Sequence, residues 1–107
     1  MTSHSWKLRV ANAEFLRSKK VKEYMAEKMN GSACINVRYD LNGRITDLLY
    51  KSDCNAFNEI TDCATLGVKK LSDGKYFLTL YLEEDVDNNV KMTLEETVKE
   101  FNSLKRA

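Results

Sequence analysis

The stretch ACINVRYDLNGRITDLLY, residues 33–50, decides the fold. Asn42-Gly43 lies at its centre and predicts a two-residue type I′ turn, because both central residues of that turn need a positive φ. Counted outward from such a turn, residues of the two arms meet in pairs on one shared face: Leu41 with Arg44, Tyr39 with Thr46, Val37 with Leu48 and Ile35 with Tyr50. Since the register and the apolar pattern agree, we predict an antiparallel hairpin.

The other face of this hairpin carries polar residues. Arg38 falls opposite Asp47, and opposite charges that face each other across two strands attract. Cys34 lies on the same face, away from Ile35 and Val37, and we interpret it as an inert thiol rather than a reactive one.

A second hairpin is predicted over ATLGVKKLSDGKYFLTLYLEE, residues 64–84. A three-residue loop, Ser72-Asp73-Gly74, with Gly74 in the left-handed conformation keeps the apolar residues on one face: Val68 pairs with Leu78, Leu66 with Leu80 and Ala64 with Leu82. A two-residue Asp-Gly turn would instead set Lys69 opposite Leu78, so we prefer the longer loop. The preferred register turns Tyr81 to the opposite face.

The segments around the hairpins are predicted from shorter patterns. Residues 6–10 alternate between apolar and basic side chains, which indicates a short half-buried strand. Asn12 is a good N-cap for a helix over about residues 13–29, and Asn30-Gly31 would end it. Residues 52–63 fit either a short helix or a loop that leads into a strand.

The stretch EEDVDNNVKMTLEE, residues 83–96, fits two interpretations. Its acidic and amide residues have the spacing of a calcium loop, but Val90 occupies the position where that motif needs the sharp turn of a glycine. Thr93 and Glu96 instead form a capping box ahead of a helix over about Leu94–Lys105. We therefore interpret the stretch as a strand end, a turn and a capped helix, and expect no metal site.

These elements predict an α+β fold. We expect one domain over residues 1–107, a two-layer sandwich with a mostly antiparallel sheet of four to five strands and two helices on one face. The chain is 43% hydrophobic and 31% charged with a net charge of +1, which is typical of a globular domain and argues against disorder. The polar face of the sheet would be open to solvent or to a partner.

The sequence also indicates a compartment. No apolar run reaches the roughly 18 residues of a membrane span, and the start lacks the apolar core of a secretory signal. The chain has three cysteines, Cys34, Cys54 and Cys63, and an odd number is expected of free thiols in a reducing compartment. We therefore expect a cytoplasmic protein without a membrane partner.

Few residues point to catalysis or to a cofactor. His4 is the only histidine and has no evident Ser or Cys partner, and no pair of cysteines has zinc-site spacing. Four glycines form none of the phosphate-binding loops or nucleophile elbows. We expect a protein that is not an enzyme and holds no cofactor.

Two kinds of macromolecular contact remain, and a small-ligand-binding domain or an enzyme built between sheet and helices is a third, less favoured interpretation. The first is with another protein, as in an inhibitor, a toxin-immunity protein or a phage-type antagonist of a host protein. Its predicted surface is the polar sheet face with an acidic rim, made of Arg38, Asp47, Tyr81, Glu83, Glu84, Asp85 and Asp87. The alternative is nucleic-acid binding through the basic run on the first helix, made of Arg17, Lys19, Lys20 and Lys22. The sequence favours the protein partner and leaves open a monomer or a homodimer.

Overall fold

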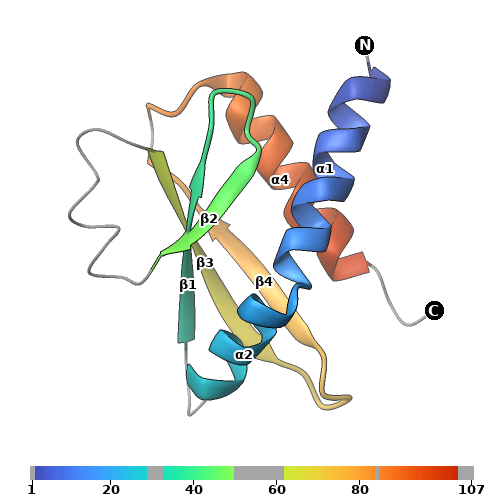
Figure 1. Cartoon of the computed structure of the whole chain (residues 1–107), viewed down its shortest axis with the longest axis vertical. Coiled ribbons are helices and arrows are strands. Elements are labelled where there is room, and N and C mark those ends of the chain that lie inside the picture. The colour runs from blue at the N-terminus through green and yellow to red at the C-terminus, as the bar shows by residue number, and fades with distance from the viewer. Residues whose placement is uncertain (1, 29–32, 50–61, 84, 104–107) are drawn as a thin grey trace.

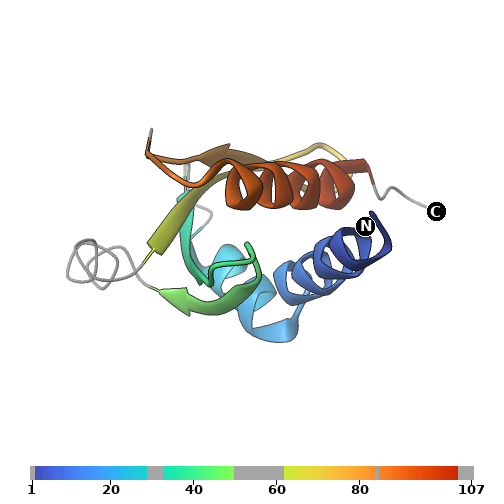
Figure 2. The ribbon, with the colours of Figure 1, turned by 90° about the horizontal axis from the view of Figure 1, so that it is seen from above.

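The computed structural model describes residues 2–28, 33–49, 62–83 and 85–103 (Figure 1). Four antiparallel strands form one sheet in the order β2-β1-β3-β4. Three helices complete the described chain, and Figure 2 shows the sheet curving around them on one side. The strands are β1 (Ala33–Tyr39), β2 (Ile45–Leu49), β3 (Asp62–Lys70) and β4 (Tyr76–Tyr81), and the helices are α1 (Thr2–Leu16), α2 (Lys19–Lys28) and α4 (Asn88–Ser103). The predicted α+β two-layer architecture is confirmed, with one helix more than expected.

The additional helix is α1, and it corrects the prediction of a strand at residues 6–10. Five residues are too few for alternation to distinguish a strand from a helix. Over a longer stretch the spacing is helical, since Leu8, Asn12 and Leu16 follow each other at intervals of four residues and lie on one face of a helix. Packing against α4 decides the outcome: Asn12 and Leu16 are buried, whereas Trp6 is 53% exposed. Local propensity of a short segment is readily overridden by such tertiary contacts.

The predicted helix over residues 13–29 is two helices in the structure. α1 ends in a tightened turn, where the Ser18 N–H donates to the carbonyl of Phe15 at 3.0 Å. Ser18 then begins α2 as its N-cap, since its carbonyl accepts from Lys22 N–H at 2.9 Å and its hydroxyl lies 3.5 Å from the Val21 nitrogen. Asn12 is therefore not a cap but a residue inside α1.

The first hairpin is confirmed, with a different turn. Val37 pairs with Leu48 and Arg38 with Asp47 as predicted, but a bulge then sets Tyr39 opposite Ile45. The loop has three residues, 41–43, because Gly43 alone takes a positive φ, +82°. The Asp40 carboxylate selects this geometry by accepting from the N–H groups of residues 42 and 44, both at 2.9 Å. Tyr50, the predicted partner of Ile35, lies outside the described residues.

The second hairpin has the predicted loop and register. Val68 pairs with Leu78 and Leu66 with Leu80, and Gly74 has φ +87°. The Leu71 N–H donates to the carbonyl of Lys75 at 2.7 Å, which closes the three-residue loop. β3 also pairs with β1, so the two hairpins join into one sheet.

α4 begins at Asn88, six residues before the predicted start at Leu94. Asp87 is its N-cap, since the carboxylate accepts from Asn89 N–H at 2.8 Å and the carbonyl from Lys91 N–H at 2.9 Å. The predicted capping box is wrong because Thr93 lies inside the helix and is buried. The interpretation as strand end, turn and capped helix is otherwise confirmed, with Val90 buried in the first turn of the helix.

The core lies between the sheet and the helices. Both layers contribute fully buried residues, so separating the layers would expose apolar surface. These residues are Leu16, Val21, Met25, Ile35, Val37, Leu66, Leu78 and Leu94. Residues 52–61 of the unassigned segment lie outside the described residues. Among the residues described, no helix has the length and apolar character to cross a membrane.

Candidate functional site

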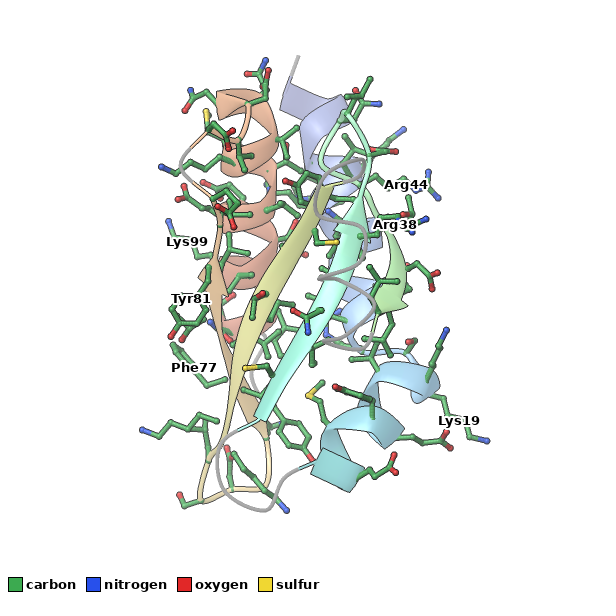
Figure 3. All side chains as sticks on the ribbon, turned by 90° about the vertical axis from the view of Figure 1, so that its left-hand side faces the viewer. Lys19, Arg38, Arg44, Phe77, Tyr81 and Lys99 are labelled. Atoms are coloured by element: carbon green, nitrogen blue, oxygen red, sulfur yellow. The ribbon has the colours of Figure 1, made fainter. Side chains whose placement is uncertain are left out.

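The side of the sheet away from the helices, called here the outer face, is turned toward the viewer in Figure 3. Successive side chains of a strand point to opposite sides, so the core residues fix which residues face outward. Ile35, Val37, Leu66 and Leu78 are buried in the core. Their neighbours along each strand therefore form the outer face: Cys34, Asn36, Arg38, Asp47, Leu49, Cys63, Thr65, Gly67, Lys69, Phe77, Thr79 and Tyr81.

The most exposed part of the outer face follows β4. Tyr76, Leu80 and Leu82 pack against the core beside buried Leu78, so the alternate residues along this segment turn outward. We call these outward residues the β4 strip: Lys75, Phe77, Thr79, Tyr81 and Glu83. Each of the five is exposed. Phe77 is 42% exposed and Tyr81 58% exposed. Figure 3 shows both aromatic side chains projecting from β4 on the same side.

The Tyr81 ring is held by a glycine on the neighbouring strand. Tyr81 pairs with Thr65, but its ring leans diagonally over Gly67, where an added Cβ would lie 3.1 Å from Cε2 of the ring. A side chain at Gly67 would push the ring away from the sheet. The small residue therefore lets Tyr81 lie against β3 with much of its surface still in solvent.

The free edge of β4 is blocked by α4 at Leu78. The side-chain amide of Asn102 accepts from the N–H of Leu78 and donates to its carbonyl, both at 2.9 Å. These are the two hydrogen bonds that an added strand would make with Leu78. Because Asn102 occupies them, an added strand cannot pair with β4 at Leu78.

Charges at the two ends of the β4 strip differ in sign. Lys75 flanks Phe77 at one end, and Lys69 lies opposite Phe77 on β3. Glu83 flanks Tyr81 at the other end. None of the ion pairs among the described residues involves these three side chains. Lys99, labelled in Figure 3, belongs to α4 and so to the other layer.

The residues predicted for the sheet-face site do not form one cluster. Arg38 and Asp47 are opposite each other on β1 and β2, as expected. Asp47 also forms an ion pair with Lys20 of α2, at 3.6 Å. Tyr81 shares their face but lies on β4, with β3 between it and Arg38. Figure 3 shows Arg38 and Tyr81 on opposite sides of the face.

The predicted acidic rim is divided. Glu83 and Asp85 are exposed, and Glu84 lies outside the described residues. Asp87 is exposed too, but its carboxylate caps α4. Of this group, Glu83 is the residue that belongs to the β4 strip.

The four basic residues of the nucleic-acid alternative are spread over the helix surface. The Arg17 guanidinium lies over the Phe101 ring of α4, 5.6 Å from its centroid. Lys19 is 4.0 Å from Glu23 and Lys20 is 3.6 Å from Asp47. Lys22 is exposed. Three of the four therefore already have intramolecular partners.

Other reactive side chains stay apart in the described part of the chain. Cys34 is exposed and Cys63 is half-buried, both as free thiols on the outer face. Cys54 lies outside the described residues. Within residues 2–28, 33–49, 62–83 and 85–103, no three His, Cys, Asp or Glu side chains are close enough to hold a metal ion.

A hollow of about 310 Å³ lies where α1, the first turn and α4 meet. Leu8, Leu41 and Met92 supply its apolar lining, with Leu41 86% exposed. The carboxylate of Asp87 at its rim is engaged in the helix cap. The hollow can therefore accept an apolar group but offers no charged pair for a polar ligand.

The residue missed by the sequence reasoning is Phe77. The predicted register placed Leu78 inward, which also turns Phe77 outward, so the signal was present. Comparison with protein-family models gives no match, and searches of the curated proteins and of the solved structures give none either.

Proposed function

We propose that this chain is a small protein-binding module that acts by contact in the cytoplasm and not by catalysis, in the manner of an inhibitor, an immunity protein or a phage-type antagonist. The observation that carries this proposal is the pair of exposed aromatic side chains, Phe77 and Tyr81, on the outer face of β4. Aromatic residues are enriched at protein interfaces and contribute a large share of their binding energy.

Rigidity of the β4 strip supports the same function. β4 is hydrogen-bonded to β3 on one side and to Asn102 on the other. Tyr81 rests on Gly67, and this contact limits the freedom of one side of its ring before a partner binds. A surface that is ordered before binding loses less entropy on association.

The nucleic-acid alternative has less support. Basic residues bind nucleic acid by neutralising its phosphates, and acidic neighbours lower the positive charge that they offer. Lys19 lies 4.0 Å from Glu23 and Lys20 lies 3.6 Å from Asp47, and Arg17 packs on Phe101. The exposed aromatic pair lies on β4, whereas the three lysines lie on α2 and Arg17 lies just before it.

A pull-down from lysate of the native host tests the proposal, with nuclease-treated and untreated lanes. The double variant Phe77→Ala/Tyr81→Ala should reduce the recovered partner at least about tenfold, because each anchor supplies a large part of the contact energy. Trp6→Ala is the matched control, since Trp6 is an aromatic residue of similar exposure, 53%, on α1. Equal recovery with the double variant and the wild type would refute the assignment of the β4 strip. Recovery that disappears with nuclease would favour nucleic acid.

A further inference from the structure

The β4 strip has a reciprocal order of side chains. It reads cation, aromatic, threonine, aromatic, anion: Lys75, Phe77, Thr79, Tyr81 and Glu83, all exposed on one face. Turned end for end about Thr79, the strip presents an aromatic group opposite each aromatic group and a charge opposite its counter-charge. A surface with this order is complementary to itself.

We infer that the partner of the β4 strip is a second copy of this chain, bound face to face about a two-fold axis that passes between the two Thr79 residues. This inference rests on the proposed function, because it assumes that the strip is a protein contact. In such a closed dimer the same patch serves both copies, so every contact occurs twice. Phe77 of one copy meets Tyr81 of the other, and Lys75 meets Glu83.

The spacing along β4 suits this arrangement. Two residues of a strand span about 6.6 Å, so the Cα atoms of Phe77 and Tyr81 lie at equal distances from that of Thr79, about 13 Å from each other. Gly67, which pairs with Thr79 on β3, adds no side chain of its own there, and the Tyr81 ring leans over it. Two sheets packed face to face can then approach to about 10 Å, and the aromatic rings fill the space between them.

Charge selects the antiparallel orientation. A parallel arrangement would set Lys75 against Lys75 and Glu83 against Glu83, and like charges in contact are unfavourable. The antiparallel arrangement sets each Lys75 against a Glu83. Neither side chain has a competing ion pair among the described residues.

The contact uses the face of the sheet and not its edge. Pairing of two β4 strands edge to edge would need the N–H and carbonyl of Leu78, which Asn102 occupies. A face contact leaves this pair of hydrogen bonds intact. The strip is narrow, so we expect a dissociation constant in the micromolar range, as for small interfaces.

Sedimentation velocity of the full chain, from low micromolar to near-millimolar concentration, tests the inference. The wild type should move from the monomer mass of 12.3 kDa toward twice that value as its concentration rises. Thr79→Arg, which sets two like charges on the two-fold axis, should remain monomeric throughout. A wild type that stays monomeric up to the highest concentration would overturn the inference.

A charge exchange distinguishes self-association on the strip from association elsewhere. Lys75→Glu and Glu83→Lys should each weaken the dimer at least about tenfold, because each creates two like-charge contacts. An equimolar mixture of the two variants should associate again, since every contact is then between opposite charges, and the double variant should also dimerise. Variants that dimerise as the wild type does, or a mixture that stays monomeric, would contradict the arrangement.

The two proposals fail in different ways. A monomeric wild type that still captures a host protein through Phe77 and Tyr81 would leave the protein-binding function standing without the dimer. Lys75 and Glu83 are both exposed, so circular dichroism should show that the charge variants keep the fold. Lost helical signal in Lys75→Glu would shift the comparison to Thr79→Arg, for which a concentration-dependent dimer would equally refute the inference.

Discussion

The turn at residues 40–44 and the turn at residues 71–75 share one backbone geometry, but the first is packed against α4 and the second is open to solvent. In each, the fourth residue is a glycine with positive φ, +82° at Gly43 and +87° at Gly74. In each, that glycine donates to the carbonyl of the first residue at 2.9 Å. A Cβ added at Gly43 would lie 2.8 Å from Cβ of Thr93, whereas nothing lies within 4 Å of one added at Gly74. The local sequence selects the turn geometry, and the tertiary contacts decide how strongly the stability of the fold depends on that turn.

Asn12 is the residue that ties the first turn, but not the second, to the helices. Its Nδ2 donates to the Gly43 carbonyl at 2.8 Å and to the Thr97 hydroxyl at 3.2 Å, and its Oδ1 accepts from Ile45 N–H at 2.7 Å. The Thr97 hydroxyl in turn donates to the carbonyl of Thr93 at 2.8 Å. This buried network joins α1, the first turn and α4, and the second turn has no counterpart among the described contacts.

Removal of the network should have the largest effect. Asn12→Ala leaves the Gly43 carbonyl and the Ile45 N–H buried without a partner, and we expect the free energy of unfolding to fall by about 4 kcal/mol. A domain of this size has roughly 5–15 kcal/mol in all, so urea denaturation should show a much lower midpoint. Asn102→Ala is the control, because Asn102 makes a similar amide pair with Leu78 in a half-buried place. It should cost about 1 kcal/mol; equal losses for the two variants would contradict the role of burial.

The same substitution in the two glycines compares the turns directly. Gly43→Ala should lower the free energy of unfolding by about 3 kcal/mol, because strain of the positive φ adds to overlap with Thr93. Thermal and urea denaturation measure the change. A small loss would mean that α4 can move away from the turn at little cost.

Gly74→Ala should cost only about 1 kcal/mol, since it introduces the φ strain into open space. The difference between the two glycine variants therefore measures the tertiary contribution at Gly43. Losses of similar size, determined under the same conditions, would show that the backbone alone accounts for both turns.

The aspartates of the two turns should show the smallest difference. Asp40 accepts two backbone N–H groups and Asp73 accepts one, that of Lys75, at 2.9 Å. Both sets of bonds are exposed, so we expect Asp40→Ala to cost about 1 kcal/mol and Asp73→Ala about 0.5 kcal/mol. The reverse order in urea denaturation would indicate that the carboxylates do not set the turn geometry.

Much of the sheet could be predicted from the sequence because its signals are local. Alternation and turn residues fix the second hairpin, and the register of the first is right up to the Arg38–Asp47 pair. The error in the first turn has a local cause as well, since Asn42-Gly43 suggested a shorter loop than the Asp40 carboxylate selects.

The helical parts were harder to predict because their signals compete. Thr93 and Glu96 fit a capping box, yet Asp87 supplied a cap earlier in the chain and Thr93 became a core residue. Asn12 suits an N-cap by residue type, but its actual partners lie 31 to 85 residues away in the chain. No local pattern reports contacts of that separation.

The candidate site was predicted in part. The register indicated that Tyr81 faces outward, and it does. The charged residues grouped with it were chosen by sign and not by strand order, so Arg38 and Asp47 fall two strands or more from β4. Strand order depends on how the two hairpins join, through β1 and β3, which the sequence left open.

Asn102 has a further consequence for the behaviour of the chain in concentrated solution. YFLTLY, the sequence of β4, combines high β-propensity with no charge, the composition of segments that stack into fibrils. The amide of Asn102 occupies a position on this strand from which such a stack would grow. The last turn of α4 therefore shields β4 at Leu78 from pairing with a strand of another chain.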